Sequence, residues 1–330
     1  MRKAIILSLA ILSTLLLTGQ TKQAQHNCRV IIDNDFGGDP DGLFDLAHQL
    51  ISPSTDVRAI IASAHHPVYP PHNDPAGKAM EDATNLLEVM GLKEQFKVFR
   101  GSSNTMTIDK PEESEGARVI ISEAMRTDTD IPLYVLCGGG LTTIASAWLM
   151  EPEIADKLTI IWIGGNTYGS TSESAEHNLN ISIPSAQVVF NLSNMRIWQV
   201  PKDAYDQTVM SVAEMKANVA PHGELGKYLV DKILERMNYL SGYFNGETYT
   251  MGDNPLTLLT ALQAFYGKSP TSSESEIRKA PIISEKGLNI ENPKGRDISV
   301  FTRLDTRLMF EDFIAKIVLY NQTNTKEYSK

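Results

Sequence analysis

The sequence predicts a doubly wound α/β fold, in which helices cover both faces of a mostly parallel sheet. Short apolar runs rich in β-branched residues recur along the chain, and Gly, Pro or Asp ends each of them. Longer segments with apolar residues at helical spacing separate these runs. Strands that alternate with helices in this way are typical of parallel sheets that are buried on both faces.

The first two thirds of the chain contain the clearest alternation. The predicted strands are Val30–Ile32, Val57–Ala62, Val98–Phe99, Leu133–Leu136, Thr159–Ile163 and Ile197–Val200. The predicted helices between them include Ala79–Met90, Ala117–Met125, Leu141–Met150 and Ala186–Phe190.

The last third is predicted to be mainly helical. Helical spacing covers Ser211–Tyr243, and another helix is expected near Asn254-Pro255, because Pro favours the first turn of a helix. The Ser-, Thr- and Pro-rich segment Gly267–Glu276 predicts a loop. A last strand over Ile298–Arg303 and a terminal helix over Leu308–Leu319 complete the expected domain, which runs from residue 26 to 330.

The N-terminus has the layout of a cleaved signal peptide. Met1-Arg2-Lys3 is basic, Ala4–Leu17 is apolar, and Thr18–Gln25 is small and polar. The alternative is a membrane anchor, but the apolar run is shorter than the ~20 residues that a spanning helix needs. Residues 1–25 are therefore expected to be removed, leaving a periplasmic or secreted protein that is not bound to the membrane.

Composition limits the classes of partner. Hydrophobic residues make up 42% of the chain and charged residues 21%, as in soluble globular proteins. The formal net charge is −10, and no basic cluster stands out, which disfavours nucleic acid as a partner. Two cysteines, Cys28 and Cys137, are too few for a disulfide framework.

An acidic loop after the first predicted strand is the strongest functional signal. Asp33, Asp35, Asp39 and Asp41 lie within nine residues, directly after the apolar run Val30–Ile32. Ligands in open α/β sheets bind outside the carboxyl ends of strands. Several carboxylates around flexible glycines suit a hard divalent cation, so the loop predicts a metal site.

Two alternatives account for part of this pattern. Asp39 or Asp41 could cap a helix that starts near Leu43, although this explains Asp33 and Asp35 poorly. Haloacid-dehalogenase-like phosphatases also carry Asp-x-Asp after a first strand, with the first Asp as nucleophile. Those enzymes usually have Thr or Val where this chain has Gly37.

Four segments together resemble the inosine-uridine-preferring nucleoside hydrolases. The acidic loop is similar to the family's Asp-x-Asp-Pro-Gly-x-Asp-Asp, and Gly139–Thr143 is similar to its Gly-x-Leu-Thr-Asn. Ile163-Gly164-Gly165 with Ala175–Asn178 resembles Met-Gly-Gly followed by Ala-Glu-Phe-Asn, and Asp253 matches a late helix-start Asp. The segments follow the family's order.

The resemblance implies a Ca²⁺-dependent hydrolase that cleaves the N-glycosidic bond of ribonucleosides, in a nucleoside hydrolase-like fold that forms homodimers or homotetramers. It implies metal ligands at Asp35, at one of Asp39 and Asp41, at the Thr142 carbonyl and at Asp253. The other carboxylate of the Asp39/Asp41 pair would bind ribose.

In the same resemblance Glu176 and Asn178 also bind ribose, Asp33 supports the site, and Asp35 is the general base. Glu176 and Asn178 are otherwise expected to be solvent-exposed loop residues, and Thr142 and Asp253 ordinary helix-start residues.

The sequence also departs from the family pattern. Pro40 separates Asp39 from Asp41, so the sequence leaves open which of the two binds metal. Gly252 replaces the His that often precedes the late Asp and can help a purine to leave. His65, His66 and His177 are candidates to replace it, or are solvated or structural histidines. A non-catalytic protein that binds nucleosides or sugars is therefore an alternative to the hydrolase.

Overall fold

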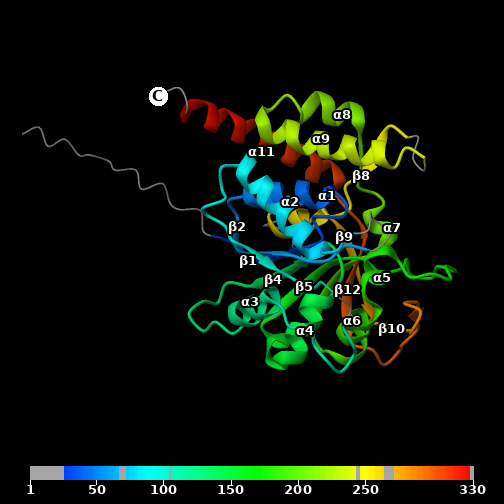
Figure 1. The fold of residues 1–330 in the computed structure, drawn as a ribbon. Helices are drawn as coiled ribbons and strands as arrows, with labels where there is room; N and C mark the ends of the chain where they lie inside the picture. The colour runs from blue at the N-terminus through cyan, green and yellow to red at the C-terminus, as the bar shows by residue number, and fades with distance from the viewer. Residues whose placement is uncertain (1–25, 67–71, 104–105, 243–245, 264–270, 328–330) are drawn as a thin grey trace, which may run out of the picture.

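A computed structural model describes residues 26–66, 72–103, 106–242, 246–263 and 271–327; the predicted signal peptide lies outside these residues. Its centre is an eight-stranded sheet with the order β3-β2-β1-β4-β5-β6-β12-β9 (Figure 1). Neighbouring strands are parallel except at one edge, where β9 pairs antiparallel with β12. The predicted fold class is confirmed.

The strands of this sheet are β1 (Cys28–Asn34), β2 (Thr55–Ala62), β3 (Val98–Arg100), β4 (Leu133–Cys137), β5 (Leu158–Ile163), β6 (Arg196–Val200), β9 (Glu274–Lys279) and β12 (Asp297–Arg303). Two small antiparallel pairs lie outside it: β7 (Val209–Ser211) with β8 (Thr248–Thr250), and β10 (Ile282–Ile283) with β11 (Asn289–Ile290).

Strand β1 shows why the alternation in the sequence is so clear. It is hydrogen-bonded on both sides, to β2 and to β4, and all seven of its residues are buried. A strand covered on both faces needs apolar side chains pointing both ways, so Val30-Ile31-Ile32 forms a continuous apolar run. The strand extends further than predicted and includes Asp33 and Asn34, which brings these polar residues into the sheet.

Two helical layers cover the sheet, each with its own hydrophobic core (Figure 1). One layer contains α1 (Asp41–Leu50), α2 (Pro75–Val89), α8 (Val212–Asn218), α9 (Gly223–Tyr239), α10 (Pro255–Thr260) and α11 (Thr306–Glu327). The other contains α3 (Glu115–Ala124), α4 (Thr142–Met150), α5 (His177–Ile181), α6 (Ile183–Gln187), the 3₁₀ helix η1 (Pro152–Asp156) and the π-helical turn η2 (Val188–Leu192). The short helix α7 (Lys202–Tyr205) follows β6.

Several predicted boundaries were wrong. The end of the predicted loop Gly267–Glu276 belongs to β9, which is held as a strand by pairing with β12 despite its polar residues; residues 264–270 are not described. The predicted helix Ala186–Phe190 is divided between α6 and η2. Among the described residues, no helix is both long and apolar enough to cross a membrane.

Candidate active site

The acidic loop lies at the point where the strand order of the sheet reverses. From β1 the chain proceeds outward to β2 and β3, and it then returns to place β4 on the other side of β1. The loops that follow β1 and β4 therefore diverge from a common edge, and ligands bind at such switch points in open α/β sheets. The acidic loop leaves β1 there, and Gly138 begins the loop that leaves β4.

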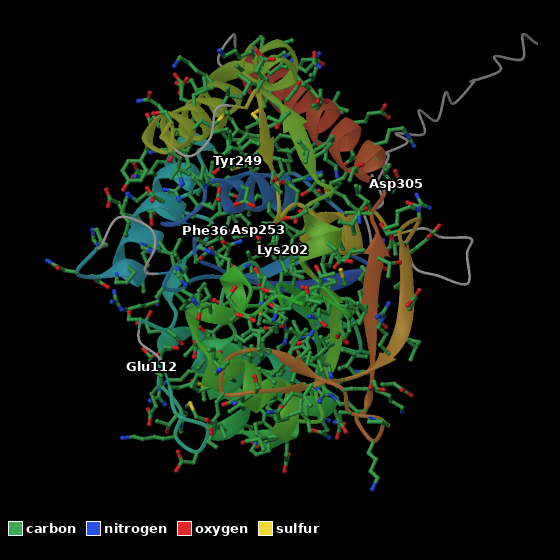
Figure 2. All side chains as sticks on the ribbon, turned by 90° about the vertical axis from the view of Figure 1, so that its right-hand side faces the viewer. Phe36, Glu112, Lys202, Tyr249, Asp253 and Asp305 are labelled. Atoms are coloured by element: carbon green, nitrogen blue, oxygen red, sulfur yellow. The ribbon has the colours of Figure 1, made fainter. Side chains whose placement is uncertain are left out.

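A pocket of about 320 Å³ opens at this edge. It collects residues from segments far apart in the sequence: Asp35, Asp39, Asp41, Gly138, Ile163, Glu176, His177, Asn178, Lys202, Tyr205, Asp206, Thr250, Gly252 and Asp253. Figure 2 labels Lys202 and Asp253 near Tyr249 of β8. Six of the eight residues that the sequence predicts for the site line this one pocket.

Asn34 connects the floor of the pocket to the C-terminal part of the chain. Its side-chain amide donates to Asp253 Oδ2 over 2.9 Å. A Cβ atom at Gly138 would lie 2.1 Å from Asn34 Nδ2 and 2.8 Å from Asp253 Oδ2. Only glycine fits at position 138, because any side chain there would break the contact that holds Asp253 over the end of β1.

Asp41 is also hydrogen-bonded to Asp253. Its Oδ2 accepts a hydrogen bond from the backbone N–H of Asp253 over 3.0 Å. Neither Asp41 nor Asp253 caps a helix. The N-cap residue is Pro40 in α1 and Asn254 in α10, and no side chain caps either helix. The capping explanation therefore fails for both aspartates.

Burial and mutual repulsion dominate the electrostatics of this pocket. Burial raises the pKa of Asp35 well above its usual range, and the charges of Asp41 and Asp39 raise it further. Burial and the charge of Asp253 likewise raise the pKa of Asp41, and burial and the charge of Asp35 raise the pKa of Asp253. Three buried carboxylates thus favour protonation unless a positive charge enters the pocket.

Asp39 has a different environment from these three. Burial raises its pKa, but the Tyr249 hydroxyl donates to its Oδ1, and this bond and the positive charge of Arg236 both lower the pKa. Asp39 is thus tied to β8 and α9, whereas Asp41 is tied to Asp253. The difference favours Asp41 over Asp39 as a partner of Asp35 and Asp253 around one ion.

Glu176 is buried, which corrects the expectation of an exposed loop residue. Its two oxygens accept four hydrogen bonds: Oε2 from the N–H groups of Gly165 and Leu179, and Oε1 from the Asn178 N–H and the Tyr205 hydroxyl. This is the full acceptor capacity of a carboxylate, so Glu176 caps α5 and fixes the loop between β5 and α5.

Asn178 donates from its side chain to the Ile163 carbonyl over 2.8 Å. This bond orients the Asn178 amide in the pocket wall.

Two predicted residues do not line the pocket. Asp33 is 1% exposed and accepts a 2.5 Å hydrogen bond from Ser63, which in turn contacts Thr143 over 2.9 Å. Burial raises the pKa of Asp33 to about 7. Thr142 begins α4 and is buried, but no hydrogen bond of its side chain caps the helix. Asp33 is thus buried behind the pocket lining, and its supporting role stays a prediction.

Of the three candidate histidines, only His177 lines the pocket. His177 lines the pocket, and its ring lies 4.5 Å from that of His66. Burial, together with the nearby positive charge of His66, lowers the pKa of His177 to about 4. His65 does not line the pocket, and its Nδ1 lies 2.9 Å from the carbonyl of His66.

Sequence reasoning missed Asn34 and the residues that follow β6. Lys202, Tyr205 and Asp206 come directly after the carboxyl end of β6, so the rule that places sites at strand ends could have identified them. No such signal marks Tyr249, which reaches Asp39 from β8.

The donor set of the pocket fits a hard divalent cation. Among the residues that the structure describes, no group of three or more His, Cys, Asp or Glu side chains is already arranged around a single point. The pocket nevertheless gathers buried carboxylates that repel one another, and the buried side-chain oxygens of Asn34 and Asn254 have no hydrogen-bond donor within the described part of the chain. Oxygen ligands of this kind bind cations such as Ca²⁺.

The sequence comparisons agree with this geometry. A family model described as inosine-uridine preferring nucleoside hydrolase matches residues 30–284. A pyrimidine-specific ribonucleoside hydrolase, RihB, from Escherichia coli O1:K1 / APEC is 34% identical over 119 residues, which cover 34% of this chain and 37% of the relative. A putative enzyme of the same name from Shigella boydii serotype 4 is matched over 48% of its length. The chain thus spans less than half of these curated relatives.

Solved structures show the same fold over nearly their whole length. A purine-preferring ribonucleoside hydrolase from Gardnerella vaginalis has a TM-score of 0.71 at 18% identity, and the match covers 89% of this chain and 99% of that one. A plant nucleoside hydrolase, PpNRh1, has a TM-score of 0.70 at 17% identity, over 88% of this chain and 99% of that one. At these identities the likeness concerns the fold.

Proposed function

This chain belongs to the inosine-uridine preferring nucleoside hydrolase family, and we propose that it hydrolyses the N-glycosidic bond of ribonucleosides to free base and ribose with the help of a bound Ca²⁺. The observation that carries the proposal is the group of buried carboxylates, Asp35, Asp41 and Asp253, at the switch point of the sheet. Their mutual repulsion supports a cation site, and the family supports a sugar above it.

The cation would be held by Asp35, Asp41 and Asp253, which all line the pocket. The resemblance adds the backbone carbonyl of Thr142, which lies outside the pocket lining and would have to approach the ion. Asp41 and Asp253 are already joined through the Asp253 N–H, so these two ligands are held in place relative to each other. Bound Ca²⁺ supplies a positive charge that lowers the pKa of a coordinated water. The same charge would remove the reason for the raised pKa values of the three carboxylates.

Asp35 is the proposed general base. It is the carboxylate of the Asp35/Asp41/Asp253 group that follows β1 directly, and its side chain lines the pocket where the attacking water would lie. Its carboxylate takes one proton from the water as the oxygen bonds to the anomeric carbon. The bond from that carbon to the base nitrogen breaks, and the base leaves with the electron pair. The negative charges around the sugar stabilise the positive charge that develops on the ribose ring.

The ribose would be held by Asp39 and Asn178, which line the pocket beside the carboxylate group. Glu176 also lines the pocket, and because its oxygens already accept four hydrogen bonds, we propose that it positions Asn178 and Tyr205 around the sugar. A ribose hydroxyl would reach Glu176 only by displacing one of these donors.

The leaving-group side has no side chain at position 252. A Cβ atom at Gly252 would lie 3.2 Å from Asp41 Oδ2 and 3.7 Å from the ring of Tyr205. The Tyr205 ring therefore borders the space that a His would enter in the family pattern. His177 and Lys202 line this pocket with side chains that end in basic nitrogens, and they are the proposed contacts to the departing base.

The phosphatase alternative has no support in this geometry. It needs Asp33 as an accessible nucleophile, but Asp33 is 1% exposed, bonded to Ser63 and absent from the pocket wall.

The decisive experiment is to incubate the purified chain with a panel of purine and pyrimidine ribonucleosides in excess Ca²⁺ and to measure free base and reducing sugar. Release of both products supports the proposal. Nucleoside binding without product would establish the non-catalytic binding protein instead, and p-nitrophenyl phosphate serves as the negative control substrate.

We further propose that the protein is exported to the periplasm or secreted after loss of residues 1–25, and that it forms a homodimer or homotetramer. Mass spectrometry of the natural N-terminus and sedimentation of the purified protein test these two statements. An intact Met1 with firm membrane association would identify the apolar run as an anchor.

A further inference from the structure

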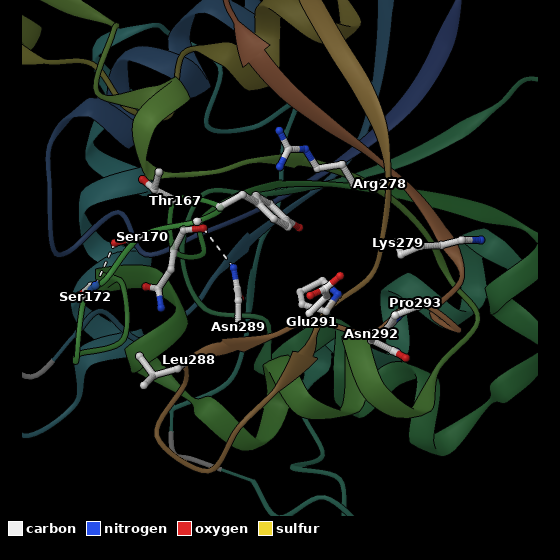
Figure 3. Close-up of a pocket in the computed structure, with 14 residues that line it drawn as sticks. Thr167, Ser170, Ser172, Arg278, Lys279, Leu288, Asn289, Glu291, Asn292 and Pro293 are labelled. Carbon is white, nitrogen blue, oxygen red and sulfur yellow. Dashed lines mark hydrogen bonds between the residues drawn. The ribbon is translucent and has the colours of Figure 1, made fainter.

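A second pocket, of about 660 Å³, is lined in part by the loop that connects β5 to α5 (Figure 3). Its volume is within the range of small-molecule binding sites. One wall comes from residues 166–172 of that loop, and the other from β9 and the β10–β11 hairpin. The side chains that supply most of its polar groups are Asn166, Thr167, Ser170, Ser172, Asn289 and Asn292.

The two walls are fixed to each other. Asn166 donates from its side chain to the Gly287 carbonyl over 3.1 Å, and Asn289 donates from its side chain to the Asn166 carbonyl over 3.3 Å. The pocket is therefore built in advance, and a ligand would not have to order the loop in order to bind.

A flat surface at one side of this pocket is also rigid. The guanidinium of Arg278 lies 4.8 Å from the centre of the Tyr168 ring, and the Tyr168 hydroxyl donates to Gln199 Oε1 over 2.7 Å. Gln199 in turn donates to the Gly164 carbonyl over 2.9 Å. Stacking and hydrogen bonding thus hold the aromatic ring in a fixed orientation.

The charged side chains around this pocket disfavour an anionic ligand. Arg278 pairs with Glu276 over 2.8 Å, and Lys279 pairs with Asp297 over 2.8 Å. Glu291 adds a further carboxylate to the wall. Two cations against three carboxylates leave a net charge of −1, which disfavours phosphate groups.

We propose that this second pocket binds a neutral carbohydrate. Neutral amide and hydroxyl groups can both donate to and accept from sugar hydroxyls, and the flat face of the Tyr168–Arg278 pair, with Pro281 and Pro293, suits the apolar face of a sugar ring. The site is distinct from the acidic pocket, and it does not depend on the proposed hydrolase activity.

The test is calorimetric titration of the whole protein with D-ribose, D-glucose, D-xylose, cellobiose and maltose, with glucose 6-phosphate as the charged comparison. We expect at least one neutral sugar to bind with a Kd of about 1 mM or below. Ser170→Trp places an indole in the pocket from an exposed loop position and should raise that Kd about tenfold or more. Tyr168→Ala, which removes the platform, should have the same effect.

The matched control is Tyr239→Ala. Tyr239 is 61% exposed and also stacks with an arginine, Arg236, but it lies outside this pocket. Sugar affinity should be unchanged in this variant. The proposal fails if no neutral sugar binds, if only the phosphorylated sugar binds, if Ser170→Trp binds as the parent does, or if the control loses affinity equally.

Discussion

The two ends of strand β1 both carry buried charge, but they compensate it differently. At the start of the strand, Glu123 accepts from Arg29 over 2.6 Å, and the side chains of Arg126 and Arg58 lie 3.0 and 3.3 Å from it. At the other end, Asp35 meets the like charges of Asp41 and Asp39. A buried carboxylate that serves stability comes with its own cations, whereas Asp35, Asp41 and Asp253 meet mainly like charges, which the proposed metal ion would offset.

The difference between the two ends of the strand can be tested by the same carboxylate-to-amide change at each end. Asp35→Asn removes the proposed base, and kcat should fall about 10²–10⁴-fold in nucleoside hydrolysis assays. Because the change also removes one of several repelling charges, the metal-free variant should unfold at an equal or higher denaturant concentration than the parent. Hydrolysis at the parental rate would exclude Asp35 as the general base.

Glu123→Gln should have the opposite outcome. It leaves the buried Arg29 without its ion pair, so the free energy of unfolding should fall by about 3 kcal/mol at pH 7. Activity per folded molecule should be retained, because Glu123 lies at the amino end of β1, away from the pocket. Urea unfolding monitored by circular dichroism gives the first quantity. A variant as stable as the parent would show that the Arg29–Glu123 ion pair does not contribute to stability.

Calcium should sharpen the difference without any mutation. A ligand that binds only the folded state stabilises it by about 2.7 kcal/mol at a free concentration of 100 times its Kd. We expect parent and Glu123→Gln to gain similar stability from Ca²⁺ over EDTA, and Asp35→Asn to gain less. Melting curves with Mg²⁺ as the comparison ion measure this. A calcium site would be contradicted if Ca²⁺ left the melting curve of each of the three proteins unchanged.

A third arrangement lies at the far end of α1, where His48 Nε2 is 2.8 Å from Asp312 Oδ2. Burial lowers the pKa of His48 to about 4 even though the bond to Asp312 raises it, and Lys316 lowers it further. The neutral ring donates to Asp312, and its Nδ1 has no partner among the described residues, so a second proton there would be buried without an acceptor.

His48 should therefore weaken the fold in acid. A depressed folded-state pKa gives stability that is fully present above the unfolded value near 6.5 and is lost as pH falls toward 4. Between pH 7 and pH 5 the loss should be about 2 kcal/mol or less. His48→Gln keeps an amide donor for Asp312 and should remove this part of the pH dependence. If the free energy of unfolding changes with pH by the same amount in the parent and in His48→Gln, His48 does not titrate in this range.

The sequence could reveal the central part of the fold because both faces of the sheet are buried. Runs such as Val30-Ile31-Ile32 have no polar side chain to obscure the pattern. Strand β9 carries mainly exposed polar residues and is held by pairing with β12, so no local pattern announces it. The second pocket could not be predicted for the same reason, because its walls come from β9, a hairpin and a loop, none of which has a clear local pattern.

The site was predictable where a motif places carboxylates after a strand, as with Asp35 and Asp41. Contacts made across the chain were not: Asn34 meets Asp253 only in three dimensions, and Tyr205 reaches Glu176 from the end of β6. The four hydrogen bonds that Glu176 accepts were not predictable either, because two of their donors, Gly165 and Tyr205, come from other segments of the chain.

The contacts that join α1 and β1 to α10 have a consequence for the order of folding. Asn34 bonds Asp253, and Asp45 accepts from Thr257, across 219 and 212 residues of sequence. Closing such long loops is slow compared with forming local structure. The N-terminal strands can pair before the last third of the chain has arrived, but the acidic pocket cannot be complete until α10 docks. Ion binding would therefore report the final stage of folding, and a fragment that stops before residue 250 would lack it even with every residue of the acidic loop present.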